Sequence, residues 1–349
     1  MPKISIIVPI YNVETYLDEC LGALVNQTLQ DIEIICVDDC GTDNSMQIAE
    51  RFAANDARIK LVYNDKNSGL SASRNNGMKL ATAPYIMFCD SDDWFADDMC
   101  QVMYDKMEST GAELGIFGFE VFYEANLDKK SADDQYFAVK YNGIMPATHD
   151  VLDKHPVCAC GKIYRRDLIQ EHDLQFPYGL RHEDEFWYPA YCVWVNNVVF
   201  VQNKFYKYRR RAGSIMNKTY RKKSLNLDPL HIAMEYFNYV KEHNQLEKHK
   251  NWFWGIMFFR LLGASLNYSG KHNTNQCYKM AHKFIQENWD KTNADFVSKR
   301  RIAQIMNKNV HTRKILFGII KIKEDVTQKR IQFAGITVWS KKYVPNVTD

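Results

Sequence analysis

Residues 84–95 of this sequence read PYIMFCDSDDWF, an apolar run followed by three acids within four residues. The run over 85–89 has the composition of a buried β-strand. The acids are Asp90, Asp92 and Asp93, and carboxylates this close repel one another and raise each other's pKa. Either water or a cation must offset that repulsion, so the stretch indicates a strand that ends in a solvated acidic turn or in a cation site.

The segments around this strand alternate between apolar β-branched runs and helical patterns. Strands are expected over 4–8, 33–37, 59–63, 85–89 and 114–119, with Pro9 ending the first of them. Helices are expected over 14–27, 46–54, 71–81 and 97–109. Regular alternation of this kind predicts an α/β fold, a Rossmann-like and mostly parallel sheet flanked by helices.

Polar side chains follow three of these strands at the point where each strand ends. They are Tyr11 with Asn12, Asp38 with Asp39, and the acidic run from Asp90. Ligands of such sheets bind outside the carboxyl ends of the strands, so we expect the three sites to converge on one cleft. An Asp-x-Asp pair suits Mg²⁺ or Mn²⁺, which complete their coordination with phosphate oxygens of a substrate.

Charge divides the chain into two parts. Residues 1–202 contain 16 Lys and Arg against 32 Asp and Glu, whereas residues 203–349 contain 29 against 10. An acidic part suits metal ions, and a basic part suits phosphates, anionic lipid or nucleic acid. We expect a catalytic domain over 1–220 and a basic, mainly helical region over 221–349, with helices over 230–242, 252–266 and 277–288 and a short hairpin over 331–342.

The sequence features favour a cytoplasmic chain with reduced thiols. The N-terminus has no signal-peptide layout, and the nine cysteines include no CxxC pair. Cys158 and Cys160 lie near His155, but their spacing is wrong for zinc, so ordinary burial is favoured. The longest apolar stretch, 252–266, contains Arg260 and is too short to span a membrane.

Several motifs in a fixed order resemble the family 2 glycosyltransferases. They are PIYN at 9–12, VDDCGTDNS at 37–45, NSGLSASRNNG at 67–77, FCDSDDW at 88–94, GKIYRRDLI at 161–169, LRHEDEFW at 180–187 and YKYRRRAGSI at 206–215. The resemblance implies a GT-A fold and an inverting enzyme that uses a UDP-sugar. The motif style is similar to bacterial enzymes that build lipooligosaccharide or capsule.

The resemblance also implies roles in donor binding. Tyr11 would stack on the uracil ring, and Asp39 would accept the hydrogen bond of the uracil imide N–H, while Asp38 would orient the loop. The family usually has a glycine where this chain has Cys40. The resemblance therefore does not define the conformation of this turn. The planar guanidinium of Arg74 would bind diphosphate, or would instead pair with the acidic run.

The remaining site residues follow from the later motifs. Asp92 would hold the metal, with Asp90 as a second ligand or a contact to ribose, and Asp93 would anchor the following turn. Asp184 would be the general base that takes the acceptor proton, with Glu183 beside it. The basic segment Arg209, Arg210 and Arg211 would close over the diphosphate, or would be a solvated charge run. Trp94 and Trp187 would stack on sugar faces or pack in the core.

We therefore expect a metal-dependent inverting glycosyltransferase that moves a hexose or N-acetylhexosamine from a UDP-sugar to a bacterial surface glycan or a lipid-linked oligosaccharide. A sugar-nucleotide nucleotidyltransferase and a non-catalytic sugar-nucleotide-binding protein are the alternatives; the former usually has a glycine-rich basic loop, which VPIYNVET at 8–15 lacks. The aromatic and basic residues after 203 would contact the anionic inner face of the cytoplasmic membrane, form homo-oligomer contacts, or pack inward as a helical bundle. They follow no nucleic-acid-binding module.

Overall fold

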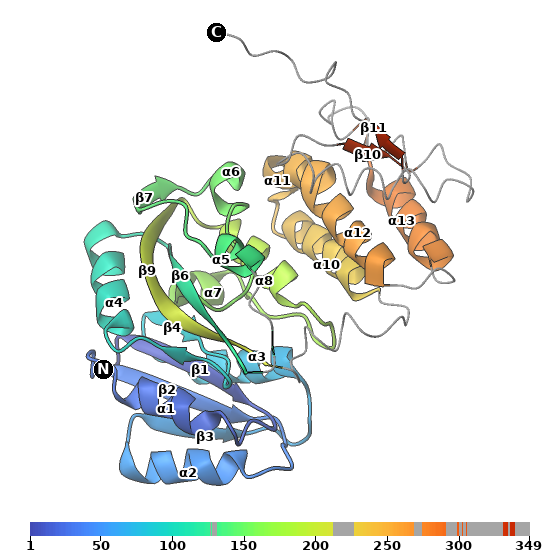
Figure 1. The fold of residues 1–349 in the computed structure, drawn as a ribbon. Helices are drawn as coiled ribbons and strands as arrows, with labels where there is room; N and C mark the ends of the chain where they lie inside the picture. The colour runs from blue at the N-terminus through green and yellow to red at the C-terminus, as the bar shows by residue number, and fades with distance from the viewer. Residues whose placement is uncertain are drawn as a thin grey trace. The chain divides into compact units, whose positions relative to one another are not determined.

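The chain forms two compact units, Met1–Lys218 and Thr219–Asp349 (Figure 1). The structure is a computed structural model. It describes residues 1–125, 127, 131–211, 227–268, 274–290, 299, 302, 305, 331–333 and 336–338.

Four parallel strands form the first half of the sheet in unit 1, in the order β3-β2-β1-β4. Their bounds are β1 Ile4–Ile10, β2 Ile32–Asp38, β3 Ile59–Tyr63 and β4 Tyr85–Phe88. Every residue of β1 is buried, as expected for a central strand covered on both faces. All four strands run in one direction, so the polar segments that follow them lie at the same edge of the sheet.

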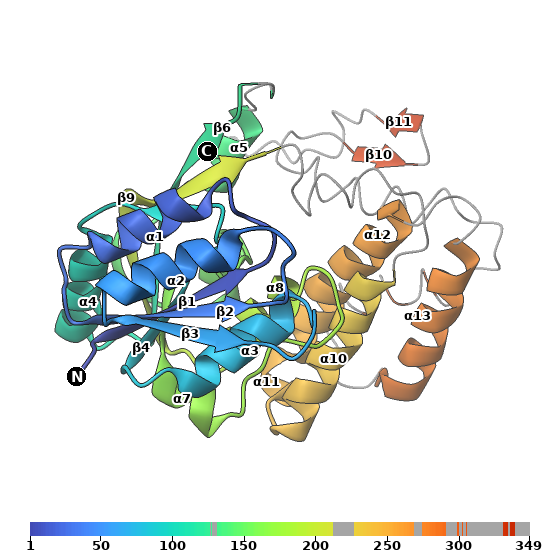
Figure 2. The same ribbon diagram turned by 90° about the horizontal axis from the view of Figure 1, so that it is seen from below.

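Helices cover both faces of these strands. Helices α1 (Leu17–Val25) and α2 (Ser45–Asn55) lie on one face, and α3 (Leu70–Leu80) lies on the opposite face (Figure 2). Gly77 lets α3 approach the sheet closely, because a Cβ at this position would lie 2.5 Å from Cγ2 of Ile7. The close approach matters for the site, since α3 also carries Arg74.

The expected end of the first strand at Pro9 is wrong. Strand β1 continues through Pro9 to Ile10, and Pro9 is in register with Val37 of β2. The Ile7 carbonyl accepts a hydrogen bond from the backbone N–H of Cys89, so the backbone groups of Ile7 point toward the β4 side of β1. Residues two apart in a strand point their backbone groups to the same side, so those of Pro9 also face the β4 side. Strand β4 ends at Phe88 beside Ile7, so the missing N–H of Pro9 removes no hydrogen bond from the sheet.

The second half of the sheet mixes directions, in the order β4-β8-β6-β9-β5 with β7 also beside β9. The strands are β5 Trp94–Phe95, β6 Leu114–Tyr123, β7 Gly143–Pro146, β8 Lys162–Arg165 and β9 Asn197–Arg210. The helices are α4 Met99–Thr110, α5 Ser131–Tyr136, α6 His149–Leu152, α7 Arg166–Glu171 and α8 Asp184–Cys192. The antiparallel pairings are short, and the long pairing of β6 with β9 is parallel. The predicted α/β fold with a mostly parallel sheet is confirmed.

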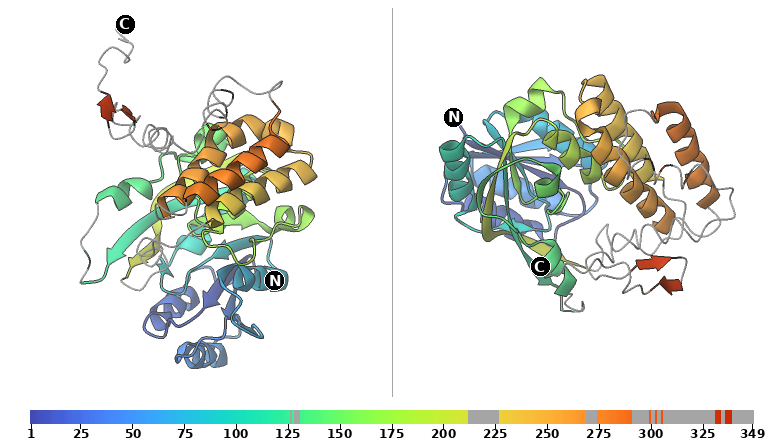
Figure 3. Two further views of the ribbon diagram at one scale, coloured as in Figure 1. Left: turned by 90° about the vertical axis from the view of Figure 1, so that its right-hand side faces the viewer. Right: turned by 90° about the horizontal axis from the view of Figure 1, so that it is seen from above.

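The second unit is mainly helical, as predicted. It contains α10 (Asp228–Glu242), α11 (Leu246–Trp252), a π-helical turn η1 (Phe253–Met257), α12 (Phe258–Tyr268) and α13 (Thr274–Asn288). The yellow to orange helices α10, α12 and α13 lie side by side (Figure 3). Strands β10 (Ile331–Phe333) and β11 (Ile336–Val338) form the antiparallel pair expected near the C-terminus.

Large aromatic side chains form the core of this helical unit. Phe253, Trp254, Phe258 and Phe259 are each at most 4% exposed. Of the alternatives for these four residues, the structure therefore matches the inward-packed bundle. Within the described ranges, we find no helix long and apolar enough to cross a membrane.

Candidate active site

Arg74 is the centre of a buried cluster of charges in unit 1. The side chain is 1% exposed, and its guanidinium lies over the rings of Phe88 and Phe176. Nη2 binds Asp90 Oδ1 at 2.9 Å, and Nη1 binds Asp184 Oδ1 at 3.0 Å. One side chain of α3 thus joins the acidic run after β4 to the start of α8.

Glu183 is the third carboxylate of the cluster. Its Oε1 accepts a hydrogen bond from Arg74 Nη1 at 2.6 Å, and it is 7% exposed. Burial and the charge of the adjacent Asp184 raise the pKa of Glu183 to about 7. One guanidinium neutralises three carboxylates only in part, so the cluster retains negative charge.

Asp184 is the first residue of α8, where backbone N–H groups favour a carboxylate. Its side chain is 23% exposed, so it is accessible to a ligand, unlike that of Glu183. Burial raises the pKa of Asp184 above its ordinary value, while the Arg74 guanidinium acts in the opposite direction. A carboxylate with a raised pKa, partly exposed and held by the hydrogen bond from Arg74, suits a general base.

The three acids of the run after β4 bind different partners. Asp90 binds Arg74, whereas Asp92 Oδ2 accepts a hydrogen bond from Arg211 Nε at 2.5 Å. Asp93 is 1% exposed and accepts the backbone N–H of Arg209 at 2.7 Å, which ties the turn to β9 as its predicted anchoring role requires. The acids therefore face different partners instead of forming a uniformly solvated turn.

A divalent cation fits this arrangement. The structure describes no group of three or more His, Cys, Asp or Glu arranged to hold a metal ion by themselves. Mg²⁺ and Mn²⁺ commonly use one or two carboxylates and complete their coordination with substrate phosphates, which is what Asp92 and Asp90 offer. Burial and the charge of Asp90 raise the pKa of Asp92, so negative charge here is undercompensated and a cation would relieve it.

The arginines at the end of β9 take different partners. Arg210 binds both carboxylate oxygens of Asp133, at 2.9 and 3.0 Å. Arg209 lies over the ring of Trp94 at 4.6 Å and forms an ion pair with Glu19. Of the three predicted diphosphate-binding candidates, Arg211 is the one whose guanidinium binds a side-chain carboxylate of the acidic run. The sequence left this choice open.

Asp39 holds the loop between β3 and α3. Its carboxylate accepts hydrogen bonds from Asn64 Nδ2 at 2.9 Å, Ser68 N at 2.7 Å and Gly69 N at 2.9 Å. Asp38 Oδ1 accepts the backbone N–H of Gly41 at 3.3 Å, a bond within the turn after β2 that the sequence expected Asp38 to orient. Asp39 keeps one acceptor position on Oδ2 beyond these three bonds.

Tyr11 and Cys40 follow the ends of β1 and β2. Tyr11 directly follows β1 and is 48% exposed, so its ring is available for stacking. Cys40 has φ +58°, a conformation that favours glycine, and its Sγ donates to the Asn64 carbonyl at 3.0 Å. This explains the departure from the family pattern: the turn keeps the glycine-like conformation, and the thiol hydrogen bond supports it.

The two tryptophans named from the sequence differ. Trp187 is fully buried and stacks on Phe176 with centroids 4.2 Å apart, so it belongs to the core. Trp94 is half-buried and contacts both Arg209 and Phe122.

Sequence reasoning gave no role to Lys162, a buried lysine of β8 whose ammonium lies 3.9 Å from Cys158 Sγ. The motif GKIYRR at 161–166 is the sequence feature that could have drawn attention to this lysine.

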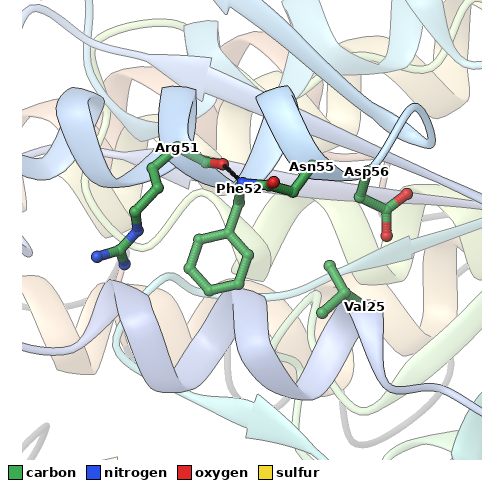
Figure 4. Close-up of a pocket in the computed structure, with 5 residues that line it drawn as sticks. All are labelled: Val25, Arg51, Phe52, Asn55 and Asp56. Carbon is green, nitrogen blue, oxygen red and sulfur yellow. Dashed lines mark hydrogen bonds between the residues drawn. The ribbon is translucent and has the colours of Figure 1, made fainter.

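One further pocket, of about 350 Å³, is lined by Val25, Arg51, Phe52, Asn55 and Asp56 (Figure 4). Val25 and Asn55 are the last residues of α1 and α2, so the pocket lies toward the amino ends of the strands. Ligands of open α/β sheets bind at the opposite edge, where the charged cluster lies.

Comparison with known proteins identifies the family. The profile described as glycosyl transferase family 2 matches residues 5–173. EpsH of Bacillus subtilis (strain 168), whose name places it among glycosyltransferases, is 34% identical over 258 residues, covering 71% of this chain and 72% of EpsH. The chain belongs to the family 2 glycosyltransferases, enzymes that transfer a sugar from a nucleotide-sugar. This assignment favours the predicted transferase over a nucleotidyltransferase and over a non-catalytic binding protein.

Other relatives extend the comparison. Glycosyltransferase GlyA of Streptococcus pneumoniae serotype 4 is 32% identical to this chain over 220 residues. The matched residues cover 61% of this chain and 31% of GlyA, so the chain spans about a third of the length of GlyA. Residues 1–349 of Staphylococcus aureus TarS, solved in complex with UDP-GlcNAc, superpose with a TM-score of 0.60 at 20% identity, covering 95% of this chain and 97% of that one. The TarS likeness supports the GT-A fold.

Proposed function

We propose that this enzyme moves a hexose or N-acetylhexosamine from a UDP-sugar to a hydroxyl of a bacterial surface glycan, with inversion at the anomeric carbon and Asp184 as the base. One observation carries the proposal: Arg74 binds Asp90 and Asp184 with the same guanidinium. The residue proposed as the base therefore lies beside the acidic run proposed to bind the donor.

The donor would bind along the carboxyl ends of the strands. Tyr11 supplies an exposed ring for the uracil, and Asp39 has one acceptor position left for the imide N–H. Arg211 would exchange its contact with Asp92 for the diphosphate, since a guanidinium binds phosphate oxygens in a bidentate manner. The neighbour TarS was solved with UDP-GlcNAc, which supports a UDP-sugar as the donor.

Asp92, together with Asp90, would hold Mg²⁺ or Mn²⁺, which when bound neutralises charge that develops on the departing diphosphate. The chain's own acids and bases perform the rest of the chemistry. Asp184 takes the proton of the acceptor hydroxyl as the oxygen attacks the anomeric carbon from the face opposite UDP. Arg74 keeps the carboxylate oriented, and it favours the ionised form that the base needs before this step.

The acceptor class rests on the resemblance of the motifs to enzymes of surface-glycan synthesis. Contact with an anionic membrane would rest on charge, because Phe253, Trp254, Phe258 and Phe259 of the helical unit pack inward. Co-sedimentation with phosphatidylglycerol vesicles at low and high salt tests this. Binding that salt abolishes supports a peripheral electrostatic contact, and absence of binding at low salt refutes it.

The donor screen tests the proposal most broadly. The protein is incubated with Mn²⁺ or Mg²⁺ and one of UDP-glucose, UDP-galactose, UDP-GlcNAc or UDP-GalNAc, and UDP release is followed with and without glycan acceptors. We expect release from one donor class, abolished by EDTA. Binding of nucleoside triphosphates with no binding of any UDP-sugar would contradict the proposal.

A further inference from the structure

Tyr16 is a half-buried residue directly before α1 whose ring contacts two arginines. Arg209 belongs to the end of β9, and Arg211 follows that strand. Their guanidinium carbons lie over the Tyr16 ring, 5.2 and 5.0 Å from its centroid. At such distances the face of an aromatic ring attracts a cation. Tyr16 and the arginines are far apart in the sequence, so only the fold brings them together.

The hydroxyl of Tyr16 fixes the position of the ring. It donates a hydrogen bond to Glu124 Oε1 at 2.6 Å. Glu124 directly follows β6, and its backbone N–H donates to the carbonyl of Arg210 at 3.1 Å. Strands β6 and β9 pair in parallel as far as Arg210. The ring is therefore tied to the same end of the sheet that carries the two arginines.

Both arginines that lie over the ring also bind Asp92. Arg209 Nε donates to the backbone carbonyl of Asp92 at 2.9 Å, and Arg211 Nε donates to Asp92 Oδ2 at 2.5 Å. Asp92 is the candidate metal ligand, so the two guanidinium groups lie beside the position proposed for the diphosphate of the donor.

A cation–π contact suits a residue that must hold an arginine and still let it bind a ligand. The attraction acts between the charge and the ring, and it requires no N–H donor. The N–H groups of Arg211 can therefore exchange a carboxylate oxygen for phosphate oxygens while the ring still holds the guanidinium. Ordering a long side chain costs free energy on binding, and a side chain that is already held pays less of that cost.

We propose that Tyr16 is a positioning residue for donor binding, whose ring holds Arg209 and Arg211 beside Asp92 so that Arg211 reaches the diphosphate. This inference rests on the proposed function, because it takes Asp92 as the metal ligand and Arg211 as the residue that binds the diphosphate.

The test measures the Kd of UDP in the presence of Mn²⁺ by calorimetry. Tyr16→Leu removes the ring, whereas Tyr16→Phe keeps the ring and removes the bond to Glu124. Each substitution is made in the wild-type chain and in Arg211→Met, and urea unfolding of every variant gives its stability. Tyr104→Leu is the matched control, because Tyr104 is a half-buried tyrosine of α4 whose ring centroid lies 4.9 Å from the ammonium of Lys3, at the amino end of β1.

We expect Tyr16→Leu to raise the Kd of UDP about fivefold, the equivalent of one cation–π contact. Tyr16→Phe should raise it less, because the ring remains. In the Arg211→Met chain, Tyr16→Leu should change the Kd by less than about twofold, since the residue through which the ring acts is absent. Tyr104→Leu should bind UDP as the wild type does.

Wild-type affinity in a folded Tyr16→Leu would overturn the proposal. A fivefold loss that persists in the Arg211→Met chain would also overturn it, because the ring would then act through another part of the site, such as Tyr11. Tyr16→Gln also removes the ring and suits a half-buried position, so it replaces Tyr16→Leu, with the same expectations, if Tyr16→Leu does not fold.

The same variants separate this inference from the proposed function. A wild-type protein that binds no UDP would contradict the proposed function. The free energies of unfolding would then decide whether Tyr16 holds Arg211: coupling between the two substitutions supports the contact, and strict additivity overturns it.

Discussion

Asp90 and Asp184 bind the two terminal nitrogens of one guanidinium, that of Arg74, at 2.9 and 3.0 Å. The two carboxylates come from different elements, the turn after β4 and the start of α8. Because Arg74 is buried over Phe88 and Phe176, it holds them in a fixed relation.

Asp184→Asn should abolish transfer and keep donor binding. The amide cannot take the acceptor proton, and a general base contributes roughly 10²- to 10⁴-fold to a rate. We expect UDP release to fall by at least about 100-fold, while the donor Kd measured by calorimetry stays the same. Asp167→Asn, which alters an exposed carboxylate on α7, is the control and should retain the wild-type rate. Transfer at the normal rate in Asp184→Asn would remove Asp184 from the mechanism.

Arg74→Met should destabilise the fold as well as the site. It leaves three carboxylates without their cation, and breaking a buried ion pair in this way costs about 3–5 kcal/mol. Arg51→Met is the matched control, because the exposed pair of Arg51 with Asp18 contributes roughly 0–1 kcal/mol. Urea unfolding of both variants measures the difference. Equal free energies of unfolding for the two variants would show that the buried ion pairs of Arg74 contribute no more stability than the exposed pair of Arg51.

Asp92→Asn should weaken donor binding and remove the response to metal. The wild-type rate should rise with Mn²⁺ concentration to a plateau, and the variant should show little or no such rise. A variant that keeps the wild-type metal response would place the metal ligand elsewhere.

Arg211→Met and Arg210→Met distinguish two candidates for diphosphate binding. Arg211 contacts Asp92, whereas Arg210 is engaged by Asp133 in a two-point ion pair. We expect Arg211→Met to raise the KM for the UDP-sugar by about tenfold, the equivalent of one charge-assisted hydrogen bond, and Arg210→Met to raise it less. The reverse order would mean that the β9 arginines rearrange on donor binding.

Glu33 should make the fold sensitive to acid. Burial alone would raise its pKa, but hydrogen bonds from Lys60, Ser5 and Thr82 outweigh burial and lower the pKa to about 2 from an ordinary value of 4.5. The lowered pKa contributes stability that is fully present above about pH 4.5 and is lost as the pH falls toward 2, an amount of roughly 3 kcal/mol.

The corresponding measurement is urea unfolding between pH 7 and pH 3 for the wild type and Glu33→Gln. The variant should lack part of the acid-dependent loss, so the two stability curves should converge as the pH falls. Parallel curves over this range would contradict the assignment.

The sequence predicted the parallel half of the sheet closely because each strand there is a continuous apolar run. Strand β3 has the predicted bounds, and β1, β2 and β4 differ by a few residues. The second half was less accessible. Strand β9 pairs with three other strands and shifts register near Gly118 of β6, so its pattern is neither continuous nor alternating.

The candidate site was predictable in its residue types and less so in its contacts. The motif order pointed to Asp90, Asp92 and Asp184, but Arg74 was assigned to diphosphate or to the acidic run, and its pairing with Glu183 and Asp184 depends on how α8 packs against α3. The sequence does not indicate the partners of Lys162, because they are backbone carbonyls and a pattern of side chains cannot predict them.

The central claim is a single displacement in which Asp184 acts across the sugar from UDP, so the anomeric configuration of the first product tests it most directly. Hydrolysis or transfer from the UDP-α-sugar that the donor screen selects is followed by proton NMR before the sugar can mutarotate. We predict that the β-anomer forms first and that Asp184→Asn forms neither anomer at a comparable rate. An initial α-anomer would mean retention of configuration and would contradict the mechanism.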